Sequence, residues 1–291
     1  MSDAIVSKLK EVMIKTIPKK VSIAQKSLFK NWDLFLQRFC KVGGVIEATP
    51  LCSPNLISQP SISFFIEPSG QSTLVGTFDR IEATQYVNGG CFFPATSLPE
   101  MNIQEFTSSV GNVLYDKGLI GHVTVDLVTF PNPQDPDGHP LFWAVDISAH
   151  ITDNATACLF FDILMEGQLD PMTGEYEIES TDSTLDESDK RGDADFAAVR
   201  KEPRNFMFCN YLHHPGLASI QYKTFFHMCR LEQISFDLEN RMGTTFYMYD
   251  SLQSAVVGLL AIGVHRKIAV QHMIDSLNFV QNQAGVIPDK V

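Results

Sequence analysis

The segment GHVTVDLVTFPNPQDPDGHPLFWAVDIS (residues 121–148) holds two apolar, β-rich runs separated by a loop rich in Pro and Asp. Turn-forming residues between two such runs predict a pair of neighbouring strands, at 122–130 and 141–148. Each predicted strand carries one acid, Asp126 in the first and Asp146 in the second. The sequence therefore predicts that two carboxylates lie close together on one sheet.

Asp146 is followed, at two-residue spacing, by Ser148 and His150. Residues two apart on a strand point to the same face, so these three polar side chains are predicted to share one face. Mg²⁺ prefers carboxylate oxygens together with nucleotide phosphates, and Asp126 and Asp146 are suited to supply the carboxylates. The alternative is structural: Asp146 caps the following turn, and Asp126 pairs with a Lys or Arg.

Elements upstream and downstream of this strand pair follow from apolar periods and turn residues. A β-hairpin is predicted over 61–81, with its turn at Ser69-Gly70. Asp79 and Arg80 come where its second strand is expected to end. The other elements predicted before residue 166 are a helix at 34–42 stopped by Gly43-Gly44, a strand at 45–48, a turn at Gly89-Gly90, a helix at 103–117 ending at Gly118, and a helix at 154–165.

From residue 166 to 195 the apolar period disappears, and nine acids collect between Glu166 and Asp189. Such a segment does not recover an ordering entropy of about 1–2 kcal/mol per residue, so we expect an exposed, mobile loop. Proteases should cut it first, between Met172 and Arg191. Beyond it the sequence predicts a helix at 220–231, a hairpin over 234–249 with a turn at Met242-Gly243, a strand at 256–263 and a helix at 265–280.

Charge and composition exclude several classes of function. The 291 residues include 22 Lys+Arg and 34 Asp+Glu, a net charge of −12, which repels nucleic acids and anionic membranes. No run approaches the roughly 18 consecutive apolar residues of a membrane span. The six cysteines lack any metal-binding spacing and predict reduced thiols in the cytoplasm. Residues 1–41 are basic, which indicates a solvated helix face or, alternatively, docking to an acidic partner such as tubulin tails.

Three stretches together resemble the second half of an ATP-grasp domain. They are FFIEPSGQSTLVGTFDRIEATQYVNGGCFFPA (64–95), GLIGHVTVDLVTF (118–130) and LFWAVDISAHITDNAT (141–156). Within the ATP-grasp proteins they are similar to the peptide-ligase group that includes pheganomycin ligase. They are closer still to the C-terminal region of the IQ motif-containing protein H family, which the stretches GGVIEATP (43–50) and NYLHHPGL (210–217) also resemble.

The resemblance and the order of elements imply an α+β fold with three parts. Residues 1–165 are expected to form the C-terminal half of an ATP-grasp-like domain, an antiparallel sheet with helices. Residues 166–196 are the expected acidic, flexible loop. Residues 197–291 are expected to form a small α+β extension that packs on the first part.

ATP-grasp proteins use ATP and Mg²⁺ to phosphorylate a carboxylic acid, which an amine or another nucleophile then attacks. Cationic groups offset the charge on the transferred phosphoryl group. By position, the resemblance places Glu47 by the adenine, Asp126 and Asp146 as Mg²⁺ ligands, Ser148 where the family has an Asn ligand, His150 where it has an Arg, and Arg80 as a phosphate or substrate contact.

Two departures weaken the catalytic interpretation. A Ser hydroxyl is a weaker metal ligand than an Asn carbonyl, and a His is mostly neutral at pH 7, where an Arg stays charged. The Gly-rich phosphate loop of the family is expected upstream of this chain. We therefore expect a degenerate or non-catalytic nucleotide-binding or scaffold module, which the resemblance places in cilia or sperm flagella with axonemal or other protein partners. The alternative is an ATP- and Mg-dependent carboxylate–amine ligase. The chain shows no IQ motif that would bind calmodulin.

Overall fold

The computed structural model describes residues 3–84, 87–98, 101–132, 134–135, 138–180, 200–248 and 251–285. The chain forms two compact units, residues 1–51 and 52–291. Within the described ranges, no helix combines the length and the apolar character that a membrane span needs.

The first unit contains the helices α1 (Asp3–Lys20) and α2 (Trp32–Val42). The side chain of Asn31 accepts a hydrogen bond from the Leu34 N–H and caps α2, which ends at Gly43 with a φ of 82°. The predicted helix stop at Gly43 is thus confirmed. The strand predicted at 45–48 is wrong, because these residues pair with no strand in the described part of the chain.

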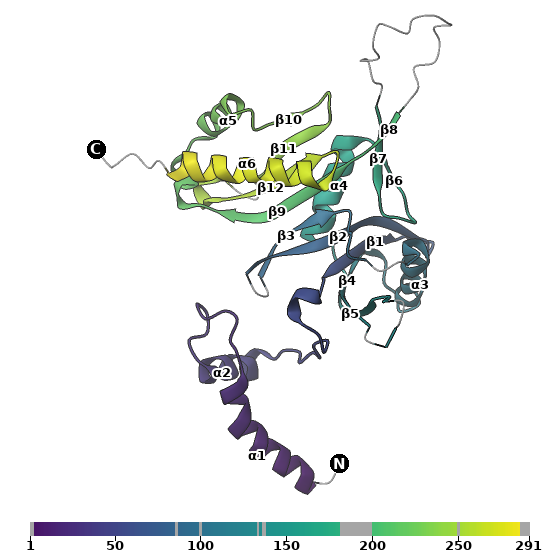
Figure 1. Cartoon of the computed structure of the whole chain (residues 1–291), viewed down its shortest axis with the longest axis vertical. Helices are drawn as coiled ribbons and strands as arrows, with labels where there is room; N and C mark the ends of the chain where they lie inside the picture. The colour runs from purple at the N-terminus through teal and green to yellow at the C-terminus, as the bar shows by residue number, and fades with distance from the viewer. Residues whose placement is uncertain are drawn as a thin grey trace, which may run out of the picture. The chain divides into compact units, whose positions relative to one another are not determined.

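The second unit is built on a nine-stranded antiparallel sheet with the order β10-β11-β12-β9-β3-β2-β1-β4-β5 (Figure 1). The strands are β1 (Pro60–Ile66), β2 (Ser72–Thr84), β3 (Val87–Phe93), β4 (Gly121–Phe130), β5 (Leu141–Ser148), β9 (Asn205–His213), β10 (Phe236–Asp237), β11 (Met242–Tyr247) and β12 (Val256–Gly263). The predicted antiparallel sheet is confirmed. Within the predicted extension at 197–291, β9, β10, β11 and β12 continue this sheet through the pairing of β9 with β3.

Helices cover both faces of the sheet (Figure 1). They are α3 (Ile103–Tyr115), α4 (Asp153–Met165), α5 (Tyr222–Leu231) and α6 (Arg266–Gly285), with short 3₁₀ helices at Pro54–Leu56, Pro215–Ser219 and Leu252–Ser254. On β12, Leu259 packs with Met273 of α6, whereas the neighbouring Leu260 packs in the cluster that contains Phe161 of α4. Because neighbouring residues on a strand point to opposite faces, α4 and α6 lie on opposite faces of the sheet.

A smaller sheet of β6 (Gln168–Leu169), β7 (Tyr176–Ser180) and β8 (Arg200–Pro203) corrects part of the expected loop at 166–196. Tyr176 and Ile178 are both 3% exposed. The Tyr176 hydroxyl also donates a hydrogen bond of 2.6 Å to Asp162. The acidic composition predicted that this segment buries too little apolar surface to offset the entropy cost of ordering. Burial of Tyr176 and Ile178 supplies that stabilisation. Residues 181–199 lie outside the described part of the chain.

Two glycine signals were wrongly interpreted as turns. Gly89 and Gly90 lie inside β3, and Gly243 lies inside β11, after a turn at 238–241. A Cβ on Gly90 would collide with the Phe208 carbonyl of the neighbouring strand. These glycines therefore serve close approach of the backbones. In the same way β2 does not end at Asp79, which lies inside the strand.

The aromatic core joins both halves of the second unit. Phe161 of α4 is fully buried, with its ring centroid 5.4 Å from that of Phe93, 4.8 Å from that of Tyr176 and 5.0 Å from that of Phe206. Its partners come from β3, β7 and β9. The Phe161 side chain thus contacts the smaller sheet through Tyr176, and both halves of the nine-stranded sheet through Phe93 and Phe206.

We predict that Phe161→Ala lowers the free energy of unfolding by about 3–5 kcal/mol, because it removes a buried ring and leaves a cavity. Urea denaturation followed by circular dichroism measures the change. Leu238→Ala is the control, since Leu238 is 80% exposed, and it should change stability by about 0.5 kcal/mol or less. Equal losses for both variants would contradict this account of the core.

Candidate functional site

The two predicted acids face each other in the structure. Asp126 on β4 and Asp146 on β5 are register partners of an antiparallel pair, which confirms that their strands are neighbours. Directly opposed residues share a face and lie within side-chain reach. Asp126 is largely buried, whereas Asp146 is exposed because β5 is the outer strand of the sheet.

Arg80 of β2 binds the first of these acids. Its Nη2 lies 2.6 Å from Oδ2 of Asp126, although β1 runs between β2 and β4. The β1 residue in register with Asp126 is Ser61, whose small side chain leaves room for the arginine to reach across. The arginine partner that the structural alternative expected for Asp126 is therefore Arg80.

The electrostatics of the acid pair are only partly balanced. Burial raises the pKa of Asp126 above its usual 3.8, and the charge of Asp146 raises it further. The Arg80 guanidinium lowers this pKa but does not offset both effects. A further positive charge near the two carboxylates would therefore stabilise their ionised forms.

A row of hydroxyl groups runs beside the acids. Thr124, two residues before Asp126 on β4, shares a hydrogen bond of 2.7 Å with Ser63 and one of 3.2 Å with Thr152. Ser148 is the register partner of Thr124 and is half-buried. The structure thus brings Ser148 to the same face and the same end of the sheet as the two acids.

Of the two other predicted residues, His150 is not brought to this row, and Glu47 belongs to the other structural unit. His150 lies beyond the end of β5 and is exposed, so the predicted face shared by Asp146, Ser148 and His150 does not continue past Ser148. Glu47 is exposed in the unit of residues 1–51. A catalytic role for His150 and an adenine contact for Glu47 stay predictions.

The donor set fits a magnesium ion in its chemistry. Asp126, Asp146 and Ser148 offer only oxygen atoms, which Mg²⁺ prefers. No group of three or more His, Cys, Asp or Glu suited to a metal occurs among the residues that the structure describes. Asp126, Asp146 and Ser148 would supply part of a coordination shell, as is usual where waters and substrate phosphates supply the rest.

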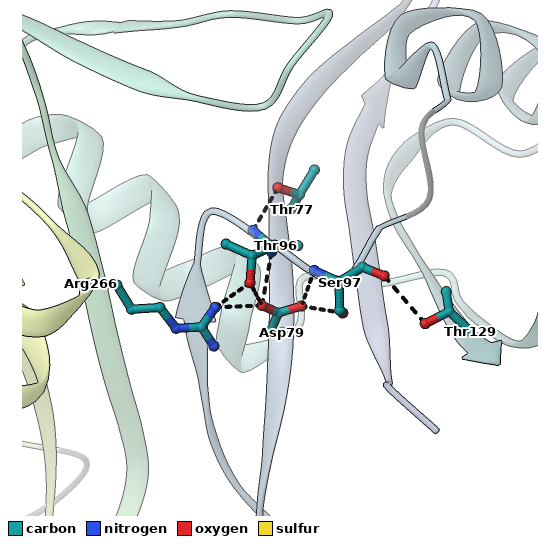
Figure 2. Close-up of polar contacts among 7 residues, drawn as sticks. Thr77, Asp79, Thr96, Ser97, Thr129 and Arg266 are labelled. Atoms are coloured by element: carbon teal, nitrogen blue, oxygen red, sulfur yellow. Dashed lines mark hydrogen bonds and ion pairs between the residues drawn. The ribbon is translucent and has the colours of Figure 1, made fainter. Parts of the chain in front are cut away.

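The sequence did not indicate the polar contacts of Asp79, which hold the strand next to Arg80 in place and are called the anchor below. Asp79 points away from the acid pair and accepts hydrogen bonds from the backbone and side chain of both Thr96 and Ser97 (Figure 2). It also forms an ion pair of 2.8 Å with Arg266, the first residue of α6. Arg266 follows Asp79 by 187 positions, so no local pattern could have indicated the contact.

This anchor keeps Asp79 ionised. Burial raises the pKa of Asp79, but the hydrogen bonds from Ser97, Thr96 and Arg266 outweigh it, and the pKa lies below the usual 3.8. The contacts fix the part of β2 from which Arg80 projects on the other face. Asp79 thereby holds the main chain of the residue that binds Asp126.

These features define an ATP-grasp-like protein. The family described as IQCH-like, ATP-grasp matches residues 1–172, more than half of the chain, and the chain belongs to this family. IQ motif-containing protein H of Danio rerio is 24% identical over 282 residues, which are 97% of this chain and 25% of that protein. The chain thus spans about a quarter of the length of this relative.

Solved structures with a similar arrangement include biotin carboxylase domains. The domain of a thermophilic 2-oxoglutarate carboxylase bound to bicarbonate has a TM-score of 0.45 and 12% identity over 91% of this chain and 58% of that one. The domain from Hydrogenobacter thermophilus with MgADP, ADP and bicarbonate has a TM-score of 0.43 and 10% identity, over 76% and 45%. The ADP complex of purK, N5-carboxyaminoimidazole ribonucleotide synthetase, has a TM-score of 0.39 and 10% identity, over 78% and 50%.

We predict that Asp79→Asn lowers the free energy of unfolding near pH 7 by about 2–3 kcal/mol, because charge-assisted hydrogen bonds are lost. Since the folded pKa lies below the unfolded one, this contribution is complete above the unfolded pKa and disappears as the pH falls through the folded pKa. The difference between variant and wild type should therefore shrink in acid. Urea denaturation near pH 7 and pH 3 tests this. Asp116→Asn, at an exposed site, is the control; a difference independent of pH would refute the ionic anchor.

Proposed function

We propose that this protein is a nucleotide-binding module of the ATP-grasp type that binds Mg²⁺-ATP. The observation that carries the proposal is the in-register pair of Asp126 and Asp146, with Arg80 in contact with the first acid. Membership of the IQCH-like ATP-grasp family supports it, because the resemblance to ATP-grasp proteins implies acidic Mg²⁺ ligands at the positions of Asp126 and Asp146.

Each residue of the site has a defined part in this proposal. Asp126 and Asp146 would hold Mg²⁺, whose charge offsets that of the nucleotide phosphates. Ser148 offers a hydroxyl beside them, and Arg80 offers guanidinium donors to an anionic group. Thr152 accepts the Ala155 N–H and caps α4, which fixes the turn that follows Ser148.

A binding or scaffold role is favoured over turnover. Ser148 is a weak metal ligand, and His150, in the family's arginine position, is exposed and carries an imidazole instead of a permanently charged guanidinium. A fixed cation for a transferring phosphoryl group is therefore missing from that position. The setting that we propose for this module is the cilium or sperm flagellum, with protein partners of the axoneme.

The second candidate is an ATP- and Mg-dependent carboxylate–amine ligase that acts through an acyl phosphate. The observation in its favour is that Arg80 and both acids share one face of the sheet, where they can meet a phosphoryl group and a carboxylate together. Such an enzyme would also need a Gly-rich loop that binds the nucleotide phosphates. ADP release that depends on an added carboxylic acid and amine would favour the ligase.

Calorimetric titration with Mg²⁺-ATP tests the proposal. Asp146→Asn should weaken binding by at least about tenfold. Loss of a residue that only orients a metal ligand already lowers metal affinity by about that factor, and loss of the ligand itself should lower it at least as much. Asp116→Asn makes the same chemical change at an exposed site on another element and should bind like wild type. Equal affinity of Asp146→Asn and wild type, or no binding of Mg²⁺-ATP by either, would overturn the proposal.

A further inference from the structure

Arg80 forms an ion pair with a carboxylate oxygen of Asp126 that a metal ion at the acid pair would need as a ligand. Its Nη2 donates to Oδ2 of Asp126 over 2.6 Å, while Asp146 stands opposite the same residue. One positive charge thus faces two negative ones. A divalent cation shared by both acids neutralises the pair more completely than Arg80 does, so the two cations compete for Asp126.

The arginine side chain can leave Asp126 while its main chain stays in place. The Arg80 N–H donates to the Gln59 carbonyl, and Asp79 anchors the preceding position. The Arg80 side chain itself is 34% exposed. An incoming phosphate group offers the released guanidinium a bidentate anionic partner.

We propose that Arg80 is a built-in counter-ion, which holds Asp126 when no metal is bound, yields it to a divalent cation and then binds the anionic ligand. This inference rests on the proposed function and adds the regulation of its site. Metal and phosphate-bearing ligand then bind with positive coupling, because each is stabilised by the same movement of Arg80.

Mn²⁺ binding to the full chain, followed by electron paramagnetic resonance without nucleotide, tests the competition. Arg80→Gln should bind Mn²⁺ about fivefold more tightly than wild type, the size expected for removal of a partly exposed ion pair. Its affinity for Mn²⁺-ATP should fall, because the released guanidinium is lost. Arg230→Gln removes an equal charge from exposed Arg230 of α5 and should change neither affinity.

Two further variants keep the outcomes distinct. Arg80→Lys retains the positive charge and should keep Mn²⁺ affinity near that of wild type, even if Arg80→Gln fails to fold. If wild type binds Mn²⁺, Asp146→Asn weakens it and Arg80→Gln binds no more tightly than wild type, the proposed function stands and the counter-ion role is wrong. If neither wild type nor Arg80→Gln binds Mn²⁺, either alone or together with ATP, the acid pair is not a metal site and both proposals fail.

Discussion

Antiparallel pairing of β4 and β5 places Asp126 and Asp146 opposite each other. The repulsion between their two carboxylates is the constraint that the neighbouring residues at this end of the sheet must satisfy. Burial of Asp126 makes the repulsion stronger than it would be in water. Arg80 offsets part of it, and reaches Asp126 because Ser61 on the intervening strand is small. Arg80 on β2 and Ser61 on β1 thus accommodate the carboxylate of Asp126 on β4.

The C-terminal part of the chain supports this arrangement, although the family match ends at residue 172. Arg266 of α6 binds Asp79, next to Arg80, and its guanidinium also lies 4.0 Å from the centroid of the Phe92 ring. β9 pairs with β3, and Phe206 stacks on Phe93 with centroids 4.9 Å apart. Residues 200–285 thus complete both the hydrophobic core and the anchor of the site, and they form one structural unit with the ATP-grasp-like half.

Asymmetric exposure of the two acids suits a site that shares a metal ion with a ligand. Asp126 is shielded and already paired, while Asp146 stands on the outer strand and meets incoming groups first. The hydroxyls of Ser63, Thr124 and Thr152 form a neutral row beside them, which orders the turn into α4 without adding charge.

The sequence alone predicted the strand pair at 121–148, the hairpin before it and most helices, because alternation and capping are local properties of the chain. It also indicated that Asp126 and Asp146 are neighbours. It misinterpreted Gly90 and Gly243, and it missed the order in Tyr176 and Ile178, since close approach and burial depend on distant strands. The contacts of Arg80 with Asp126 and of Asp79 with Arg266 emerged only in the folded sheet, because ion pairs between residues 46 and 187 positions apart have no periodic signature.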